Sequence, residues 1–201
     1  MVMWIVAVVV AYLLGSISFS YLMGKMLKGI DIRQHGSGNA GATNTLRVLG
    51  KGPAIAVLSL DVLKGMAAVW LPVWLGQDLI WVRIICGVAV IVGHNWPVFF
   101  GFKGGKGIAS TIGVMATLAF LPSLLAGIIA IVTIAVTRYV SLGSLLFTAF
   151  IPVFILLLHR PMELFWISLL VALFAFVRHR SNIVKLAKGK ENKLGAKKKV
   201  S

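Results

Sequence analysis

Long, continuous apolar runs dominate this chain of 201 residues and constrain its fold more than any other feature. Hydrophobic residues make up 59% of the sequence and charged residues only 12%, whereas an ordinary soluble domain is about 25% charged. A soluble protein of this composition would have too little polar surface to stay dispersed. Because the apolar runs do not alternate with polar residues, they predict membrane-spanning helices and disfavour a barrel.

Three polar segments interrupt the apolar runs, and we expect them to lie outside the lipid: residues 24–51, residues 94–106 and the tail 178–201. The rest of the chain is long enough for seven spans of about 19 residues, close to the ~20 that cross a bilayer as a helix. We therefore predict an all-α, polytopic membrane helix bundle that forms a single domain over residues 1–201. The predicted spans are 3–23, 52–75, 80–93, 107–121, 123–137, 143–158 and 162–177, with turns at 76–78, at Pro122 and at 159–161.

The distribution of basic residues orients the predicted bundle. The chain carries 20 Lys and Arg against 5 Asp and Glu, a net charge of +15. With the N-terminus outside, 17 of the 20 bases fall in segments on the cytoplasmic side, in agreement with the positive-inside rule. The polar segments and the C-terminus are therefore predicted to be cytoplasmic. A five-span model, with longer spans of about 27 residues, is the alternative and would also place the main loops inside. Residues 107–137 form either one kinked helix or two short ones.

The excess of bases predicts an anionic partner, and the shortage of acids limits the chemistry. Nucleic acid, anionic lipid and a phosphorylated small molecule all fit the charge. Five acidic residues make an acidic metal cage or a two-carboxylate hydrolase site hard to build. The single cysteine, Cys86, excludes an intramolecular disulfide and a Cys-rich metal site. We expect no metal and no cofactor.

The first polar segment contains a run of small and polar residues from Gly36 to Arg47. Glycine allows successive N–H groups to converge on an anion, and Arg47 could bind a phosphate through two hydrogen bonds. The alternative is a flexible turn in which Thr43 or Asn44 caps a helix. The composition fits both interpretations equally well.

The second polar segment contains the sequence Gly-Phe-Lys-Gly-Gly-Lys-Gly at residues 101–107, ahead of an apolar run. A glycine-rich loop that leads into a helix N-terminus favours anion binding, and Lys106 adds a full positive charge. The loop is not a Walker A motif, because that motif requires glycine at position 100 and a hydroxyl at 107, where this chain has Phe100 and Gly107. It predicts a phosphate bound by protein groups alone.

Polar residues elsewhere have simpler interpretations. Asp61 and Lys64 lie three apart in a predicted span and are expected to form a structural pair, because either charge alone is expensive in lipid. Such a pair also occurs in transporters. His179 and Asn182 share a helix face, and a lone interfacial histidine is more often structural than catalytic. The basic tail is expected to attract anionic lipid.

Four segments together resemble the bacterial acyl-phosphate-dependent glycerol-3-phosphate acyltransferases. They cover essentially the whole chain in the family's order. The segments are Ser-Gly-Asn-Ala-Gly-Ala-Thr-Asn from residue 37 with Arg47, Gly-His-Asn-Trp-Pro-Val-Phe-Phe from 93 with the glycine loop, Arg-Tyr-Val-Ser from 138, and Arg-His-Arg-Ser-Asn-Ile from 178 with Glu191.

The resemblance implies a multi-pass enzyme of the bacterial inner membrane whose site faces the cytoplasm. It would transfer a fatty acyl group from acyl phosphate, without acyl-CoA, to the 1-hydroxyl of glycerol 3-phosphate. The products would be lysophosphatidic acid and phosphate, in the first acylation of phospholipid synthesis. Its partners would be these two substrates and membrane lipids, and not nucleic acid.

Carried onto matching positions, the resemblance implies that Ser37, Arg47, Lys106, His179 and Asn182 are catalytic. Glu191 would serve structural integrity. The candidate phosphate-binding residues are Asn39, Gly41, Thr43, Asn44, Arg47, Gly101, Gly104, Gly105, Lys106, Gly107, Ser141, Ser144 and Asn182.

Because acyl phosphate is already activated, we expect positioning and electrostatics to carry the reaction. The hydroxyl proton could pass to a substrate phosphate, whose second pKa is near ~6, or to His179. A small membrane transporter or flippase for a phosphorylated or lipid substrate is the competing interpretation, although we find no inverted repeat. A lipid-linked phosphotransferase fits less well, because it usually needs magnesium and several carboxylates.

Overall fold

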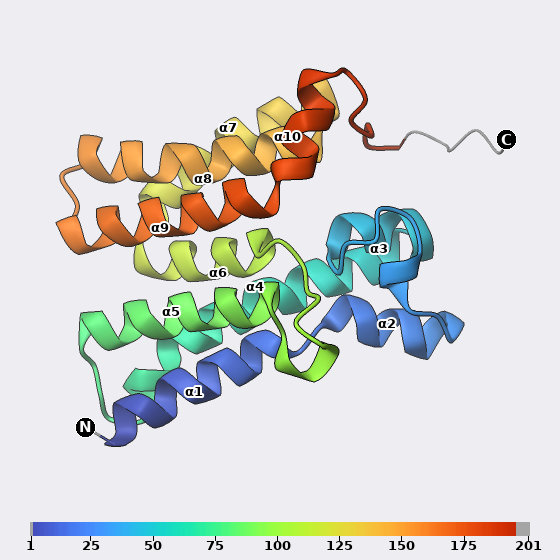
Figure 1. Ribbon diagram of the computed structural model, residues 1–201. Coiled ribbons are helices and arrows are strands. Elements are labelled where there is room, and N and C mark those ends of the chain that lie inside the picture. Colours follow the sequence, from blue (N-terminus) through green and yellow to red (C-terminus); the bar gives the residue numbers. More distant parts are fainter. Residues whose placement is uncertain (1, 196–201) are drawn as a thin grey trace, which may run out of the picture. The chain divides into compact units, whose positions relative to one another are not determined.

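The computed structural model describes residues 2–195, and within that range all of its regular elements are helices, as expected (Figure 1). Residues 196–201 of the predicted tail lie outside the described residues. The α-helices are α1 (Val2–Ser16), α2 (Phe19–Lys28), α3 (Ala42–Leu49), α4 (Lys51–Trp74), α5 (Ile80–Asn95), α6 (Ile108–Leu118), α7 (Phe120–Thr137), α8 (Val140–Leu157), α9 (Met162–Arg178) and α10 (Arg180–Ala187). Two short 3-10 helices, η1 (Ile32–Gln34) and η2 (Val98–Phe100), lie in the polar segments.

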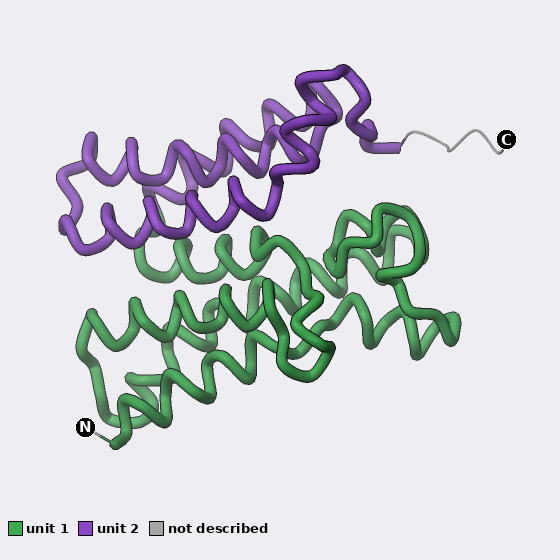
Figure 2. The backbone as a smooth tube through the Cα atoms, in the orientation of Figure 1, with its two compact units in different colours: residues 1–120 green, residues 121–201 purple. Residues whose placement is uncertain are grey.

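The chain divides into two compact units, residues 1–120 and residues 121–201 (Figure 2). In the first unit α5 packs against α1 and α4, while α6 and α3 also pack against α4. In the second unit α8 packs against α9, and α10 contacts both. The polar segments 24–51 and 94–106 therefore belong to one unit and the tail to the other. The expectation of a single domain stays a prediction.

Five segments within residues 2–195 are long and apolar enough to cross a membrane: Val2–Lys28, Lys51–Trp74, Ile80–Phe100, Phe120–Thr137 and Val140–Leu157. Helices α9 and α10, which meet at a bend of 64°, make a sixth candidate if they count as one span, and α6 is shorter than a span. Each of the seven predicted spans is helical over most of its length. Length and composition support five or six of them as membrane spans, so the count of seven stays a prediction.

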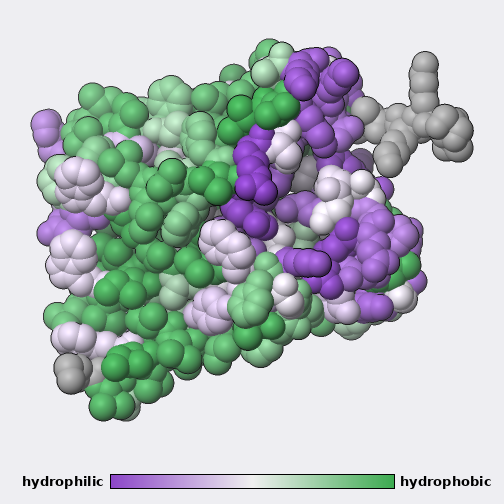
Figure 3. All heavy atoms as spheres, in the orientation of Figure 1, coloured by the Kyte–Doolittle hydropathy of each residue, from purple (hydrophilic) through white to green (hydrophobic). Residues whose placement is uncertain are grey.

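Large apolar side chains remain exposed along these helices, among them Trp74, Val136 and Leu157. Figure 3 shows hydrophobic residues over the sides of the helices, while hydrophilic residues of the first unit gather at the end where α2 and α3 lie. Such a surface fits contact with lipid along the helices and contact with water at their ends.

Two predicted boundaries in the first unit are wrong, each for a local reason. The first helical segment continues to Lys28 beyond the predicted end at residue 23, because Gly29 ends α2 in the left-handed region (φ 67°) and the Ile30 N–H returns to the Gly24 carbonyl oxygen at 3.2 Å. Helix α5 runs on to Asn95, so the first two residues of the predicted loop 94–106 are helical.

The break predicted at Pro122 is also misplaced. Residues 107–137 do form two helices, but α6 ends at Leu118 and α7 begins at Phe120. Pro122 lies in the first turn of α7, where backbone N–H groups have no intrahelical partner and proline therefore breaks nothing.

Glycines set the closest helix crossings of the first unit. Where α4 crosses α6, a Cβ atom on Gly65 would overlap the Ser110 carbonyl oxygen, and one on Gly113 would overlap the backbone of α4. The same close approach occurs between α1 and α5 at Gly15 and Gly93. In lipid, helices gain little from hydrophobic burial, so close backbone contact between small residues stabilises their association.

The turn between α7 and α8 holds the segment that follows α10. Arg138 donates from Nε and Nη2 to the Leu194 carbonyl oxygen, at 3.0 and 2.6 Å. The Leu194 N–H returns to the Arg138 carbonyl oxygen at 2.7 Å. The Lys193 ammonium also lies 5.6 Å from the centre of the Tyr139 ring. These contacts fix the end of the described part of the tail on the α7–α8 turn.

We predict that Gly65→Ala destabilises the protein, because the new methyl group meets backbone atoms of α6 that cannot rotate away. The expected loss is about 1–3 kcal/mol, the usual range for overpacking. The matched control is Gly52→Ala in the same helix, where a Cβ meets nothing within 4 Å and the better helix propensity of alanine should raise stability slightly. Thermal unfolding in detergent compares the two, and equal melting temperatures would contradict the prediction.

We also predict that Arg138→Gln lowers the melting temperature by several degrees, because it removes two hydrogen bonds to Leu194. Arg160→Gln is the control, since it deletes the same charge from an exposed residue of the α8–α9 turn. Limited proteolysis near residues 188–195 should be faster in Arg138→Gln than in wild type or in Arg160→Gln. The same cleavage rate in all three proteins would show that Arg138 does not hold this segment.

Candidate functional site

The first polar segment is organised around the buried amide of Asn44. Its Nδ2 donates to the carbonyl oxygens of Ile32 and His35, at 3.1 and 3.0 Å, and its Oδ1 accepts from the Ser37 N–H at 2.8 Å. Gly36, which has a φ of 64°, leaves no room for a Cβ beside this amide. Asn44 therefore fixes the turn that presents Ser37, a predicted catalytic residue. The alternative in which Thr43 or Asn44 caps a helix is wrong, because both residues lie inside α3, which begins after Gly41 without a side-chain cap.

A guanidinium ties the first polar segment to the second. Arg33 Nη1 donates to the Phe100 carbonyl oxygen at 2.7 Å, and Arg33 Nη2 pairs with an Asp31 carboxylate oxygen at 2.8 Å. The hydrogen bond from Arg33 holds the pKa of Asp31 below its ordinary value. The Arg33 guanidinium also stacks on the Tyr21 ring, whose centre lies 4.7 Å from that of Phe100. The two segments are thus held by charge-assisted hydrogen bonds and ring contacts together.

The glycine loop folds back onto the last turn of α5. The Gly105 N–H donates to the His94 carbonyl oxygen at 3.1 Å. A Cβ on Gly104 would overlap that same oxygen, and a Cβ on Gly105 would overlap the His94 ring and the Ala40 carbonyl oxygen. These two glycines are therefore required by close packing, a reason that the sequence pattern did not suggest. The contact with Ala40 brings the two polar segments together.

Lys106 directly precedes the N-terminus of α6. Gly107 has a φ of 79° and occupies the position before the first residue of the helix. Lys106 is half-buried. Gly101 is exposed and has a φ of 62°. A Cβ atom on Gly101 would meet nothing within 4 Å, so its backbone conformation, not close packing, favours glycine there. The predicted arrangement of a basic residue and glycines at a helix N-terminus is thus present in the structure.

The other candidates of the first unit lie around the contact between Gly105 and Ala40. Asn39 and Gly41 flank Ala40, and Thr43 follows in the first turn of α3. Arg47 is exposed in the last turn of α3. The contact between Ala40 and Gly105 thus brings Asn39 and Gly41 close to the glycine loop.

The second unit holds the remaining candidates. His179 is buried at the junction of α9 and α10, where its Nδ1 lies 2.8 Å from the Ala175 carbonyl oxygen. A carbonyl oxygen only accepts, so we assign the proton to Nδ1, which leaves Nε2 as the basic nitrogen of the neutral ring. Asn182 Nδ2 donates to Glu191 Oε1 at 2.8 Å. Glu191 thereby holds a predicted catalytic residue.

Ser141 and Ser144 lie in the first turns of α8, and both are buried. Ser144 Oγ donates to the Val140 carbonyl oxygen at 2.9 Å, whereas Ser141 Oγ has no hydrogen-bond partner in the structure. Helix α10 packs against α8 and α9. The helices that carry the candidate residues of the second unit, α8, α9 and α10, therefore pack against one another.

Sequence reasoning missed three residues that shape these segments: Arg33, Arg138 and His94. Arg33 and Arg138 act on carbonyl oxygens distant in sequence, and no local spacing reports such contacts. A weak signal existed for Asp31, whose side chain accepts from the Arg33 N–H and caps η1, since aspartate is a preferred helix cap. His94 Nδ1 lies 3.4 Å from a carboxylate oxygen of Asp61.

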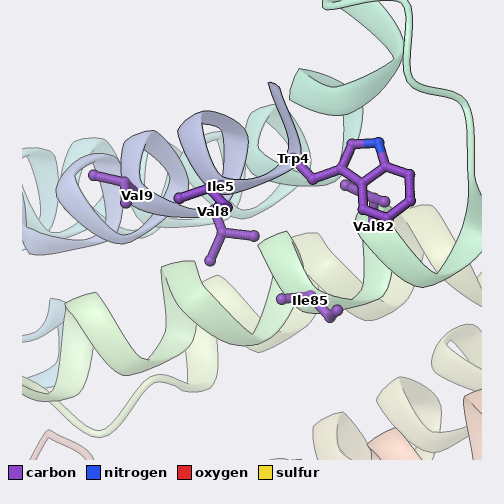
Figure 4. A pocket seen from close by; sticks show the side chains of 6 residues that line it. All are labelled: Trp4, Ile5, Val8, Val9, Val82 and Ile85. Atoms are coloured by element: carbon purple, nitrogen blue, oxygen red, sulfur yellow. The ribbon is translucent and has the colours of Figure 1, made fainter. Parts of the chain in front are cut away.

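A shallow apolar pocket of about 230 Å³ lies between α1 and α5 (Figure 4). None of the predicted site residues lines it, and its walls offer no polar group to a phosphate. The lining residues are Trp4, Ile5, Val8, Val9, Val82 and Ile85.

The chain is similar to known proteins over nearly its whole length. The family model described as glycerol-3-phosphate acyltransferase matches residues 5–189. Glycerol-3-phosphate acyltransferases of Shouchella clausii and Halalkalibacterium halodurans are 55% and 54% identical, each over 96% of this chain and 97% of the relative.

A solved structure is similar as well. The crystal structure of PlsY, an integral membrane glycerol 3-phosphate acyltransferase, in its glycerol 3-phosphate form has a TM-score of 0.89 and 38% identity, and the match covers 96% of both chains. The lysophosphatidic acid form of that protein has a TM-score of 0.87 and 38% identity, over 96% of this chain and 95% of the solved one. The chain is thus a multi-pass membrane protein, and it belongs to the glycerol-3-phosphate acyltransferase family.

Proposed function

We propose that this protein transfers a fatty acyl group from acyl phosphate to the 1-hydroxyl of glycerol 3-phosphate. The observation that carries the proposal is the full-length similarity to a solved acyltransferase whose two forms are described as the glycerol 3-phosphate and lysophosphatidic acid forms. One is the acyl acceptor of the reaction and the other its acylated product. Acyl phosphate as the donor, without acyl-CoA, follows from the resemblance of the four sequence segments.

The reaction balances with the groups of the two substrates alone. The hydroxyl oxygen attacks the carbonyl carbon of acyl phosphate, and the bond from that carbon to the phosphate oxygen breaks. Inorganic phosphate leaves with the bonding electron pair, and the hydroxyl proton passes to a base. Both substrates are anionic, so positive charge and N–H donors lower the barrier by binding the phosphates and the developing oxyanion.

We assign phosphate binding in the first unit to Lys106, Arg47 and the N-terminus of α6. A helix N-terminus carries a partial positive charge and N–H groups that point at an anion. The packed glycines Gly104 and Gly105 support this assignment, because they hold Lys106 beside that terminus. Ser37, at the turn fixed by Asn44, is proposed as a further catalytic residue.

His179 and Asn182 of the second unit are proposed to be required for activity. His179 is proposed as one candidate proton acceptor, because the contact of its Nδ1 with the Ala175 carbonyl oxygen fixes the imidazole ring in place. A substrate phosphate is the other available acceptor. Glu191 is proposed to position Asn182, while Ser141 and Ser144 add hydroxyl groups at the start of α8.

We propose that seven spans place the N-terminus outside and the site residues on the cytoplasmic face of the bacterial inner membrane. The positive-inside rule supports this orientation, since most of the bases lie in the polar segments, the α7–α8 turn and the tail. One support of the transporter interpretation is weakened, because Asp61 pairs with Lys64 and Lys64 also donates to two backbone carbonyl oxygens inside the first unit.

The purified protein, incubated with acyl phosphate and labelled glycerol 3-phosphate in the presence of EDTA, should form labelled lysophosphatidic acid. The parallel reaction contains acyl-CoA in place of acyl phosphate and should yield none. No product in either reaction, or product only with acyl-CoA, would overturn the proposed function.

Lys106→Ala should raise the KM for glycerol 3-phosphate roughly tenfold or more, because a hydrogen bond to a charged group contributes about 1.5–3 kcal/mol. The matched control is Lys103→Ala, which removes the same charge from an exposed residue of the same loop and should change KM by less than about twofold. Steady-state kinetics with varied glycerol 3-phosphate measure both. Equal KM values for the two variants would remove Lys106 from the phosphate site.

A further inference from the structure

Three ionisable side chains meet inside the helices of the first unit. Lys64 Nζ lies 2.7 Å from Asp61 Oδ1, and His94 Nδ1 lies 3.4 Å from the same oxygen. The side chains of Asp61 and Lys64 are each only 2% exposed, and that of His94 is 6% exposed. Burial of such groups in a membrane protein is expensive, so the cluster needs an explanation beyond surface charge.

The break between α1 and α2 explains why the charge of Lys64 is buried. Its ammonium donates to the carbonyl oxygens of Gly15 and Ile17, at 3.0 and 2.8 Å. These carbonyl oxygens lie where α1 ends and the helical hydrogen-bond pattern is interrupted. Lys64 satisfies them, and Asp61 balances its charge. This structural role does not require the contact between Asp61 and His94.

His94 contacts the glycine loop in two ways. Its carbonyl oxygen accepts the Gly105 N–H, and its ring, at Nε2 and Cδ2, occupies the space where a Cβ of Gly105 would stand. A rotated His94 ring would therefore collide with the loop or withdraw from it. The orientation of this ring thus sets the path of Gly104 and Gly105, which lead to Lys106 and α6.

The Asp61 carboxylate lies against that ring, with Oδ1 3.4 Å from His94 Nδ1. A negative charge at this place favours a proton on Nδ1. A carboxylate behind a histidine commonly sets the ring orientation and the tautomer, as in the outer shells of metal sites. The contact between Asp61 and His94 joins α4 to the last turn of α5, whose His94 carbonyl oxygen binds the glycine loop at Gly105.

We propose that Asp61 is a positioning residue for the glycerol 3-phosphate site: it orients His94, and His94 holds the glycine loop that places Lys106 at the N-terminus of α6. The inference rests on the proposed function, because it assigns a support to the phosphate site named there. It predicts that loss of the Asp61 carboxylate raises the KM for glycerol 3-phosphate and leaves the KM for the acyl donor unchanged.

Asp61→Asn is the first test. Asparagine keeps the size of the side chain but removes the negative charge that faces Lys64 and His94. We expect the KM for glycerol 3-phosphate to rise about tenfold, with kcat and the KM for acyl phosphate within about twofold of wild type. Asp78→Asn is the matched control at the other end of α5, where Asp78 pairs with Arg83, and it should leave all three constants unchanged.

The double variant Asp61→Asn/Lys64→Gln guards against simple unfolding. It removes both charges together, so no buried charge remains uncompensated, and neutral replacement of a buried pair is often tolerated. It still lacks the carboxylate behind His94, so the same rise in KM for glycerol 3-phosphate is expected. Melting temperatures of all variants are measured in the same detergent.

The outcomes separate this inference from the proposed function. Wild-type protein that forms no lysophosphatidic acid would contradict the proposed function. Active wild type together with folded variants of unchanged KM for glycerol 3-phosphate would contradict the role of Asp61. Loss of the folded protein in both the single and the double variant would assign Asp61 to stability alone and would contradict it too.

Discussion

The first unit depends on one buried cation. The chain bends between α1 and α2, and inside a bilayer the backbone carbonyl oxygens freed by such a break have no water to bind. The Lys64 ammonium supplies their donors, and the Asp61 carboxylate makes the buried ammonium tolerable. Because the same carboxylate contacts His94, the break, α4 and the end of α5 are connected by one set of polar contacts.

The polar segments are ordered mainly by contacts between side chains and the main chain. Asn44 engages three backbone groups of the preceding turn, Arg33 reaches the carbonyl oxygen of Phe100, and Arg138 reaches that of Leu194. Hydrogen bonds from side chains to main-chain groups can hold such loops in place without a large hydrophobic core beneath them. The candidate phosphate-binding groups are therefore displayed on loops whose backbones are fixed before any ligand binds, which is the condition for electrostatic preorganisation.

The local features of the fold could be predicted from the sequence, and its long-range contacts could not. Continuous apolar runs predict helices because lipid leaves the backbone few alternatives, and Gly107 before an apolar run correctly marked the start of α6. The turn predicted at Pro122 is wrong because, in sequence, a proline in the first turn of a helix looks the same as a proline at a helix break. The hydrogen bond from Arg33 to Phe100 spans 67 residues, so only the folded chain reveals it. The glycine-rich pattern predicts a role for Gly105, but only the neighbouring His94 ring and Ala40 explain why this residue must be glycine.

The crossing of α4 and α6 at Gly65 and Gly113 has a mechanical consequence. Helices that meet through leucine side chains can slide by changing rotamers, whereas here backbone atoms are already in contact and no softer layer lies between them. The start of α6, with Lys106 before it, is thereby kept at a fixed distance from α4. Bilayer thickness differs between membranes of different lipid composition. A backbone-to-backbone contact lets the proposed anion-binding end of α6 keep its geometry while the surrounding acyl chains vary.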